Sequence, residues 1–245
     1  MDRVLYEELT PADFLLRLKQ APIAYLPLGT LEWHGPHLPL GADGLQSKAL
    51  FCDVAQRVGG IVMPMLFLAP DRTIEYDGQT YIGMDFWSRP DAEAPRQLPG
   101  SAYYVNDHLY DALLDAVMAQ LARAGFRIVV GHGHGPANRA FRKQTASAWA
   151  KYNLRLVSAV FEQAQYGFQS DHAAANETSI MMHYYPDLVN MSALPEEVDA
   201  RLEGISGDDP RQYASADIGK AAAEETTAFL EAELMKCLAE LRIES

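Results

Sequence analysis

The chain has 245 residues, of which 49% are hydrophobic and 22% are charged, as in ordinary soluble globular proteins. Its 20 basic and 33 acidic side chains give a formal net charge of −13. Nucleic acids and anionic membranes both bind basic protein surfaces. We therefore expect neither nucleic acid nor a membrane among the partners of this protein.

The start of the chain, MDRVLYEELT, lacks the charged-then-apolar pattern of a secretion signal. No stretch approaches the ~18 consecutive apolar residues of a membrane-spanning helix. Cys52 and Cys237 lie in apparent helices and have no disulfide or metal-motif spacing, so they are expected to be ordinary packed side chains. These features predict a cytoplasmic protein.

Apolar strand-like runs alternate with helical patterns along the chain. Thr10 and Pro11 are typical helix-start residues and open the first predicted helix. In chain order, the sequence predicts a helix at 11–20, a strand at 23–29, a helix at 45–60, a strand at 61–69, a helix at 103–124, a strand at 126–133, a helix at 137–152, a strand at 154–161, a helix that begins within 171–185, and a helix at 216–242. Strands separated by helices predict an α/β fold in one domain, 1–245, with a mostly parallel sheet between two helical layers.

One long segment, residues 70–101, has no clear period and is rich in aromatic residues and prolines. An irregular segment of this length inside a compact domain is usually functional or disordered. Its aromatic content favours a functional role, as the wall of a pocket or as a subunit contact.

Two of the predicted strands end in side chains that commonly bind metals. Glu32 and His34 follow the first strand, and His132 and His134 close the third. Residues two apart in an extended chain point the same way, so each strand end can aim two side chains into one cleft. Asp43 returns from a Gly- and Pro-rich loop to the same edge of the sheet, where parallel α/β folds bind their ligands.

Imidazole nitrogens and carboxylate oxygens together suit Zn²⁺, Mn²⁺ or Fe²⁺. A chance gathering of such side chains at two strand ends is a poor explanation. The sequence therefore predicts a divalent metal site holding one or two ions, in which the two oxygens of Asp43 are suited to bridge a pair of ions.

The segment DHAAANETS places His172 and Glu177 where a loop becomes a helix. Asp, Asn and Thr are common helix-start residues, so one interpretation of this segment is helix capping. The other is a proton donor or acceptor close to the metal. The pattern alone does not separate the two interpretations.

Four segments, in order along the chain, resemble the motifs of the creatininase (creatinine amidohydrolase-like) family. LPLGTLEWHGPHLPLGAD is similar to its first motif, and AGFRIVVGHGHGPAN to its Gly-His-Gly-Gly-Asn motif. DHAAANETS resembles the His-Ala-Gly-x-x-Glu-Thr-Ser motif, and GISGDDPRQYASADIGK resembles the tail motif around Gly-Asp-Pro. The four segments span about four-fifths of the chain.

The resemblance implies a three-layer α/β/α sandwich, a homohexamer, and a hydrolytic centre with one or two metals. It implies that Glu32, Asp43 and His132 bind one metal, that His34 and Asp43 bind the second, and that His172 is the catalytic histidine. His134 stands where creatininase itself has a glutamate that binds the second metal. A shifted alignment instead makes His134 the main ligand, with His132 in place of the motif asparagine.

These inferences together predict a metal-dependent hydrolase of a small polar cyclic substrate. Metal-activated water would attack a cyclic amide C–N bond, His172 would protonate the leaving group, and Glu177 would orient His172 or cap its helix. Creatinine itself is not the expected substrate, because Tyr166 and Phe168 occur where creatininase has tryptophans. The alternatives are ring-opening hydrolysis of a polyol- or sugar-derived cyclic ketone, and a non-catalytic, metal-stabilised binding or assembly subunit.

Overall fold

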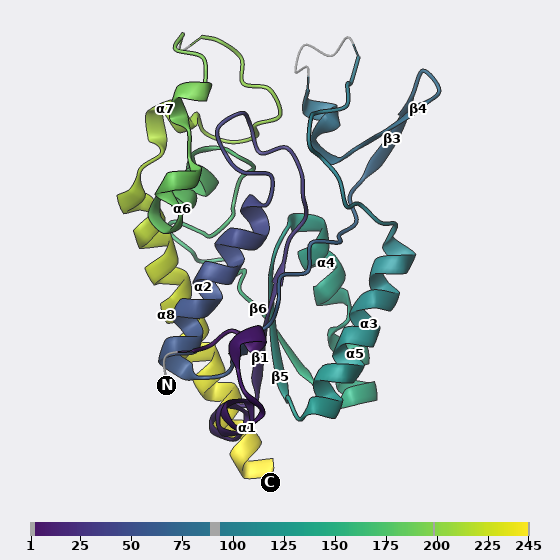
Figure 1. The fold of residues 1–245 in the computed structure, drawn as a ribbon, viewed down its shortest axis with the longest axis vertical. Helices are drawn as coiled ribbons and strands as arrows, with labels where there is room; N and C mark the ends of the chain where they lie inside the picture. The colour runs from purple at the N-terminus through teal and green to yellow at the C-terminus, as the bar shows by residue number, and fades with distance from the viewer. Residues whose placement is uncertain (1–2, 89–93, 198, 245) are drawn as a thin grey trace.

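The protein was analysed as a computed structural model that describes residues 3–88, 94–197 and 199–244. Its central sheet has four parallel strands in the order β2-β1-β5-β6 (Figure 1). The strand bounds are β1 Ile23–Leu28, β2 Ile61–Val62, β5 Ile128–Gly133 and β6 Arg155–Ser158. Because β1 and β5 are neighbours, with Pro27 opposite His132, the segments that follow these two strands leave the sheet side by side.

Helices cover both faces of this sheet (Figure 1). One layer holds α2 (Ala42–Val58), α6 (Ala175–Tyr184) and α8 (Ala216–Glu244), and the other holds α3 (Asp107–Ala124), α4 (Gly135–Lys143) and α5 (Thr145–Tyr152). The shorter α1 (Pro11–Gln20) lies beside the amino ends of the strands, and α7 (Pro210–Tyr213) precedes α8. The predicted α/β/α architecture with a parallel sheet is therefore confirmed.

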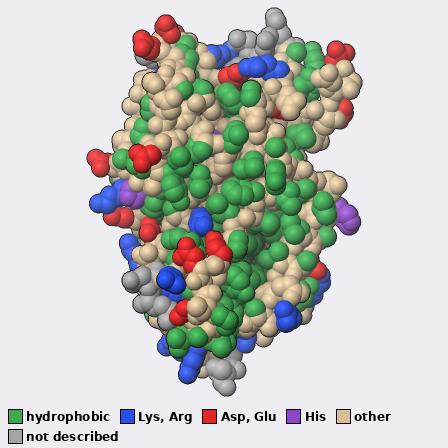
Figure 2. All heavy atoms as spheres, viewed as in Figure 1, with side chains coloured by type: hydrophobic (Ala, Val, Ile, Leu, Met, Phe, Trp, Pro, Cys, Tyr) green, Lys and Arg blue, Asp and Glu red, His purple; other side chains and the backbone are tan. Residues whose placement is uncertain are grey.

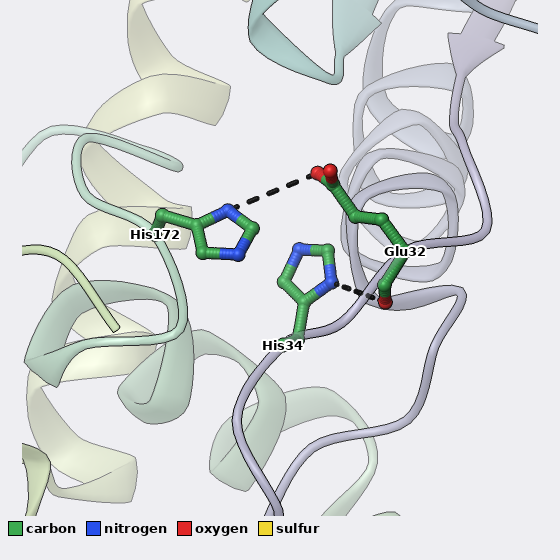
Figure 3. A group of neighbouring side chains, drawn as sticks. All are labelled: Glu32, His34 and His172. Carbon is green, nitrogen blue, oxygen red and sulfur yellow. Dashed lines mark hydrogen bonds and ion pairs between the residues drawn. The ribbon is translucent and has the colours of Figure 1, made fainter. Parts of the chain in front are cut away.

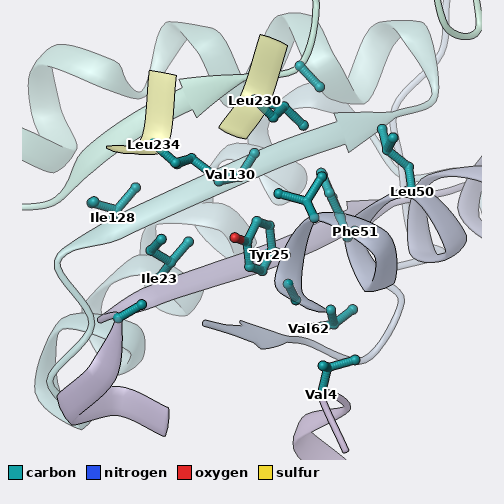
Figure 4. Close-up of a cluster of buried hydrophobic side chains, with 14 of the residues drawn as sticks. Val4, Ile23, Tyr25, Leu50, Phe51, Val62, Ile128, Val130, Leu230 and Leu234 are labelled. Carbon is teal, nitrogen blue, oxygen red and sulfur yellow. The ribbon is translucent and has the colours of Figure 1, made fainter. Parts of the chain in front are cut away.

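Two hydrophobic cores lie between the sheet and its helical layers. Successive side chains of a strand point to opposite faces, so Ile23 and Tyr25 pack toward α2 and α8 whereas Ala24 and Leu26 pack toward α3. Figure 4 shows the first core, in which Phe51 of α2 meets the ring of Tyr25 at 5.5 Å between centroids. Full burial of each large apolar side chain contributes about 1.5–3 kcal/mol, so these cores fix the strands against which the site is built.

Several element boundaries differ from those predicted from the sequence. Helix α2 begins three residues earlier than expected, and this places Asp43 in its first turn rather than in a loop. The predicted helix 137–152 is divided into α4 and α5 at Gln144. The predicted strand 61–69 keeps only its first two residues as β2, since Pro64 cannot donate a ladder hydrogen bond.

The irregular segment contains structure that its sequence pattern did not reveal. A hairpin pairs β3 (Thr73–Tyr76) with β4 (Gln79–Ile82), and a 3-10 helix follows at Gly83–Trp87. Asp77 and Gly78 both have positive φ at the turn, as two-residue hairpin loops require. Residues 89–93 of the segment lie outside the described residues. Figure 1 places the hairpin beyond the carboxyl ends of β1 and β5.

The outer surface has one notable apolar region. Figure 2 shows hydrophobic side chains grouped over the middle of one face, with charged side chains mostly toward its edge. Exposed apolar surface of this kind is common where proteins associate, and the expected homo-oligomer stays a prediction. Among the described helices, none is both long enough and apolar enough to cross a membrane.

Candidate metal centre

The segment after β1 carries two buried ligand-type side chains, Glu32 and His34, which are 1% and 0% exposed. His34 Nδ1 lies 3.1 Å from the backbone oxygen of Glu32, as Figure 3 shows, and donates its proton there. The other ring nitrogen, Nε2, faces Asp43 Oδ1 at 3.6 Å and Glu177 Oε2 at 3.7 Å. This tautomer is the one that a metal-binding imidazole needs.

Asp43 reaches the same point from the first turn of α2. A close approach of two glycines makes this possible, because a Cβ on Gly29 would stand only 3.1 Å from the Cα of Gly44. The helix can therefore begin directly against the segment after β1. Asp43 Oδ1 faces His34, and its Oδ2 lies 3.2 Å from His134 Nδ1, so one carboxylate joins the two strand ends.

At the end of β5 the side chains of His132 and His134 have different neighbours. His132 keeps the orientation of the buried residues before it, with Nδ1 3.2 Å from the hydroxyl of Ser47 on α2. His134 lies instead among the carboxylates, with Nδ1 3.1 Å from Glu32 Oε1. Gly133 between them has a φ of +143°, and a Cβ there would stand 1.6 Å from the Leu28 carbonyl oxygen. Gly133 is the last residue of β5, and its positive φ departs from ordinary strand backbone, so residues two apart no longer point the same way.

His172 and Glu177 come from the segment that leads into α6. His172 Nε2 lies 2.8 Å from the Trp33 carbonyl oxygen and donates its proton there, which leaves Nδ1 facing Glu32 Oε1 at 3.8 Å (Figure 3). Its ring lies 4.3 Å from that of His34, centroid to centroid. Glu177 Oε2 accepts a 2.7 Å hydrogen bond from the amide of Ala173.

These side chains form three overlapping groups whose ligand atoms lie within 4.8 Å of one another. The groups are Glu32, Asp43 and His134; His34, Asp43 and Glu177; and Glu32, His34 and His172. His132 belongs to none of the three groups. The Nε2 atom of His34 is buried, and among the described residues it has no hydrogen-bond partner within bonding distance, although two carboxylates face it. An imidazole nitrogen with carboxylate oxygens around it fits a divalent transition metal.

The pKa values show how strongly this cluster concentrates negative charge. Burial lowers the pKa of His34, but the carboxylates of Asp43 and Glu177 outweigh burial and raise it to about 10. Burial lowers the pKa of His134 as well, but Glu32, Asp43 and Asp71 together outweigh burial and hold it well above its usual value. In the protein without metal, protons on these two imidazoles therefore balance the buried carboxylates, as a cation would.

The other members of the cluster titrate differently. Burial together with the nearby Asp43 raises the pKa of the Glu177 carboxyl well above its usual range. Burial and the charge of His34 lower the pKa of His172, which keeps its Nδ1 free of a proton. Burial alone dominates at His132 and lowers its pKa to about 4, so this ring is neutral among Ser47 and Phe168.

Three residues that the sequence patterns did not indicate support the cluster from outside. The Tyr104 hydroxyl donates a 2.9 Å hydrogen bond to Glu32 Oε2, and Gln169 Nε2 donates to the Asp43 backbone oxygen at 3.0 Å. Asp71 Oδ2 lies 3.4 Å from His134 Nε2, an ion-pair distance. Such outer partners orient ligating side chains. The one signal in the sequence for these three residues is that they lie in or near loops of unusual composition.

A cavity of about 300 Å³ opens beside the cluster. Its lining residues are Glu32, Asp43, Asp71, Arg72, Gly83, Met84, Gly133, His134, Gly135, Pro136, Arg139, Gln169, Asp171, His172 and Glu177. The segment 70–101 does contribute to the wall, but through Asp71, Arg72, Gly83 and Met84 rather than through its aromatic side chains, which corrects the expectation that these aromatic side chains form a pocket wall. The space is small and polar, which suits a compact polar substrate.

Fold and site together define an α/β protein with a buried carboxylate–histidine cluster at the carboxyl edge of a parallel sheet. The family model described as "Creatininase: Creatinine amidohydrolase" matches residues 7–234. The chain therefore belongs to the creatininase family. A creatinine amidohydrolase from Pseudomonas putida is 26% identical over 214 residues, which cover 80% of this chain and 78% of that protein.

Solved structures show the same fold. A tryptophan-to-alanine variant of creatininase superposes with a TM-score of 0.72 at 21% identity, covering 95% of this chain and 98% of that one. A glutamate-to-glutamine variant described as Zn-Zn type gives a TM-score of 0.67 at 21% identity, covering 95% and 97%. A putative creatinine amidohydrolase from Bacteroides fragilis gives 0.60 at 21% identity, covering 87% and 88%.

Proposed function

We propose that this protein is a hydrolase with two divalent metals, which opens a small polar cyclic amide at its C–N bond. The observation that carries the proposal is the shared position of Asp43, whose two oxygens face two separate donor groups. Glu32 and His134 would complete the first metal site, and His34 and Glu177 the second. The solved relatives include creatininase forms described as Mn and as Zn-Zn, which supports either metal here.

This assignment changes two roles that the sequence suggested. Glu177 would become a metal ligand, because its Oε2 lies 3.7 Å from Nε2 of His34. His134, rather than His132, would bind a metal together with Glu32 and Asp43. This is the arrangement that the shifted alignment of the family motif predicted. The buried His132 then has a packing role beside Ser47 and Phe168.

A divalent metal bound there would supply an electrophile for a carbonyl group and would lower the pKa of a bound water molecule to about 7. The chain's own contribution to proton transfer is His172. Its Nε2 proton is fixed on the Trp33 carbonyl, so Nδ1 is the atom that accepts a proton and passes it to the leaving nitrogen. Its lowered pKa makes the neutral form the resting state, as a base requires.

Two alternatives compete with this proposal: hydrolysis of a cyclic ketone and a non-catalytic binding subunit. A cyclic ketone derived from a polyol or sugar would fit the same polar cavity, and turnover measurements separate it from an amide. A non-catalytic binding subunit would not need His172 beside the metal groups with an unprotonated nitrogen turned toward them. We therefore favour an enzyme over a binding subunit.

The proposal is tested by metal analysis together with turnover. We expect about two ions per chain, and we expect a chelator to abolish ring opening of a panel of cyclic amides and ketones. His172→Ala should keep its metal but lower kcat by about 10²-fold or more. His183→Ala, on α6 and outside the three groups, is the control. Full metal without turnover of any ring would indicate a binding subunit, and absence of metal would refute the proposal.

A further inference from the structure

The charged residues around the cavity are of two kinds. The acidic ones already have partners, since Asp71 faces His134 and Asp171 accepts hydrogen bonds from two backbone amides of α6. The remaining carboxylates belong to the three groups of candidate metal ligands. Two arginines, Arg72 and Arg139, also line the cavity, and among the described residues neither guanidinium has a carboxylate partner within 4.0 Å.

Arg139 extends from the solvent-exposed side of α4. Its Nη1 stands 3.7 Å from the point that a Cβ on Gly135 would occupy, and Gly135 itself lines the cavity. The guanidinium group is therefore held at the cavity wall, one turn of helix beyond His134. A larger residue in place of Gly135 would stand between this group and the cavity.

Arg72 comes from the opposite wall, immediately before β3. Its guanidinium carbon lies 5.2 Å from the ring centroid of Phe86 and 5.7 Å from that of Trp87. Contacts with aromatic faces orient a guanidinium group while leaving the N–H donors in its plane free. This arrangement holds a cation at the rim and does not satisfy its hydrogen bonds.

We propose that the substrate carries an oxyanion group, a carboxylate or a phosphate, and that Arg139 and Arg72 bind it at the rim of the cavity. This inference rests on the hydrolase function proposed above and narrows its substrate class. Both arginines line the same cavity, and planar Arg donors bind oxyanions in pairs of hydrogen bonds. In a chain with a net charge of −13, they also provide the local positive potential that draws an anionic substrate to this entrance.

Another interpretation is that the arginines only offset the acidic cluster and stay solvated. The two interpretations predict different binding. If the arginines only offset charge, their removal weakens every ligand alike or none. If they bind the substrate, their removal weakens only ligands that carry the oxyanion.

The experiment uses matched pairs of cyclic amides with the metal-loaded protein. Pyroglutamate is compared with pyrrolidinone, and dihydroorotate with dihydrouracil, so that each pair differs by one carboxylate. Affinity is measured by calorimetry, or as KM where the ring is opened. The variants are Arg139→Gln and Arg72→Gln, and the control is Arg142→Gln, an exposed arginine of α4 that does not line the cavity.

We expect the anionic member of at least one pair to bind more tightly than its neutral partner. Each rim variant should weaken anionic binding at least tenfold and change neutral binding less than twofold, whereas the control should change neither. Equal affinity within both pairs, or a preference that survives both rim variants, would refute the oxyanion site and leave the hydrolase proposal standing. Metal-loaded protein that binds neither member of either pair would contradict both proposals.

Discussion

The ends of β1 and β5 use the same sequence pattern with different results. Each strand is followed or closed by two ligand-type residues spaced two apart. At the end of β1 both of these residues, Glu32 and His34, belong to the three groups of candidate metal ligands. At the end of β5 only His134 does. The lesson is that spacing predicts a shared direction only while the strand keeps its ordinary backbone conformation, and the positive φ of Gly133 ends that condition.

The strongest test of this comparison is a pair of variants at the end of β5. His134→Ala should lose about one metal ion per chain and most activity, because it removes a nitrogen that lies between Glu32 and Asp43. His132→Ala should keep both ions and lose about 1–3 kcal/mol of stability, as for other disrupted buried contacts. Metal analysis and thermal unfolding measure the two effects. Loss of metal from His132→Ala with full occupancy in His134→Ala would reverse the assignment.

A second test uses the pH dependence of metal binding. The pKa of His34 is about 10 in the metal-free protein, so this imidazole is protonated at neutral pH and must release its proton before it can bind a metal. Metal affinity should therefore rise by about tenfold per pH unit for each proton released, from pH 6 toward pH 10. Calorimetry in buffers of different ionisation enthalpy counts these protons. Binding without proton release would show that His34 is not a ligand.

The smallest expected effect comes from the hydrogen bond that supports Glu32, in the segment after β1. Tyr104→Phe removes the hydroxyl that donates to Glu32 Oε2 and leaves the ring in place. Loss of such an outer partner costs about 10–100-fold in metal affinity or activity, and we expect the lower end here. Tyr103→Phe is the control, since Tyr103 is 59% exposed. Competition with a chelator of known affinity measures the change, and equal metal affinity in both variants would remove Tyr104 from the site.

Much of this architecture was readable from local patterns. Alternating apolar and helical segments predicted the parallel sheet and its two helical layers, because burial on both faces requires those patterns. The four motifs, in their order along the chain, indicated the family. The pattern also selected Glu32, His34, Asp43 and His134, each of which the fold places in at least one of the three groups of candidate metal ligands.

Other features were decided only by tertiary structure. The sequence left His132 and His134 open as alternatives, and the backbone at Gly133 separates their side chains. Asp71, Tyr104 and Gln169 meet the cluster through contacts between residues distant in the chain, and no spacing rule reports such contacts. Local sequence determines which elements form, since propensity and periodicity act over a few residues. The close packing of distant loops determines which side chains share a site.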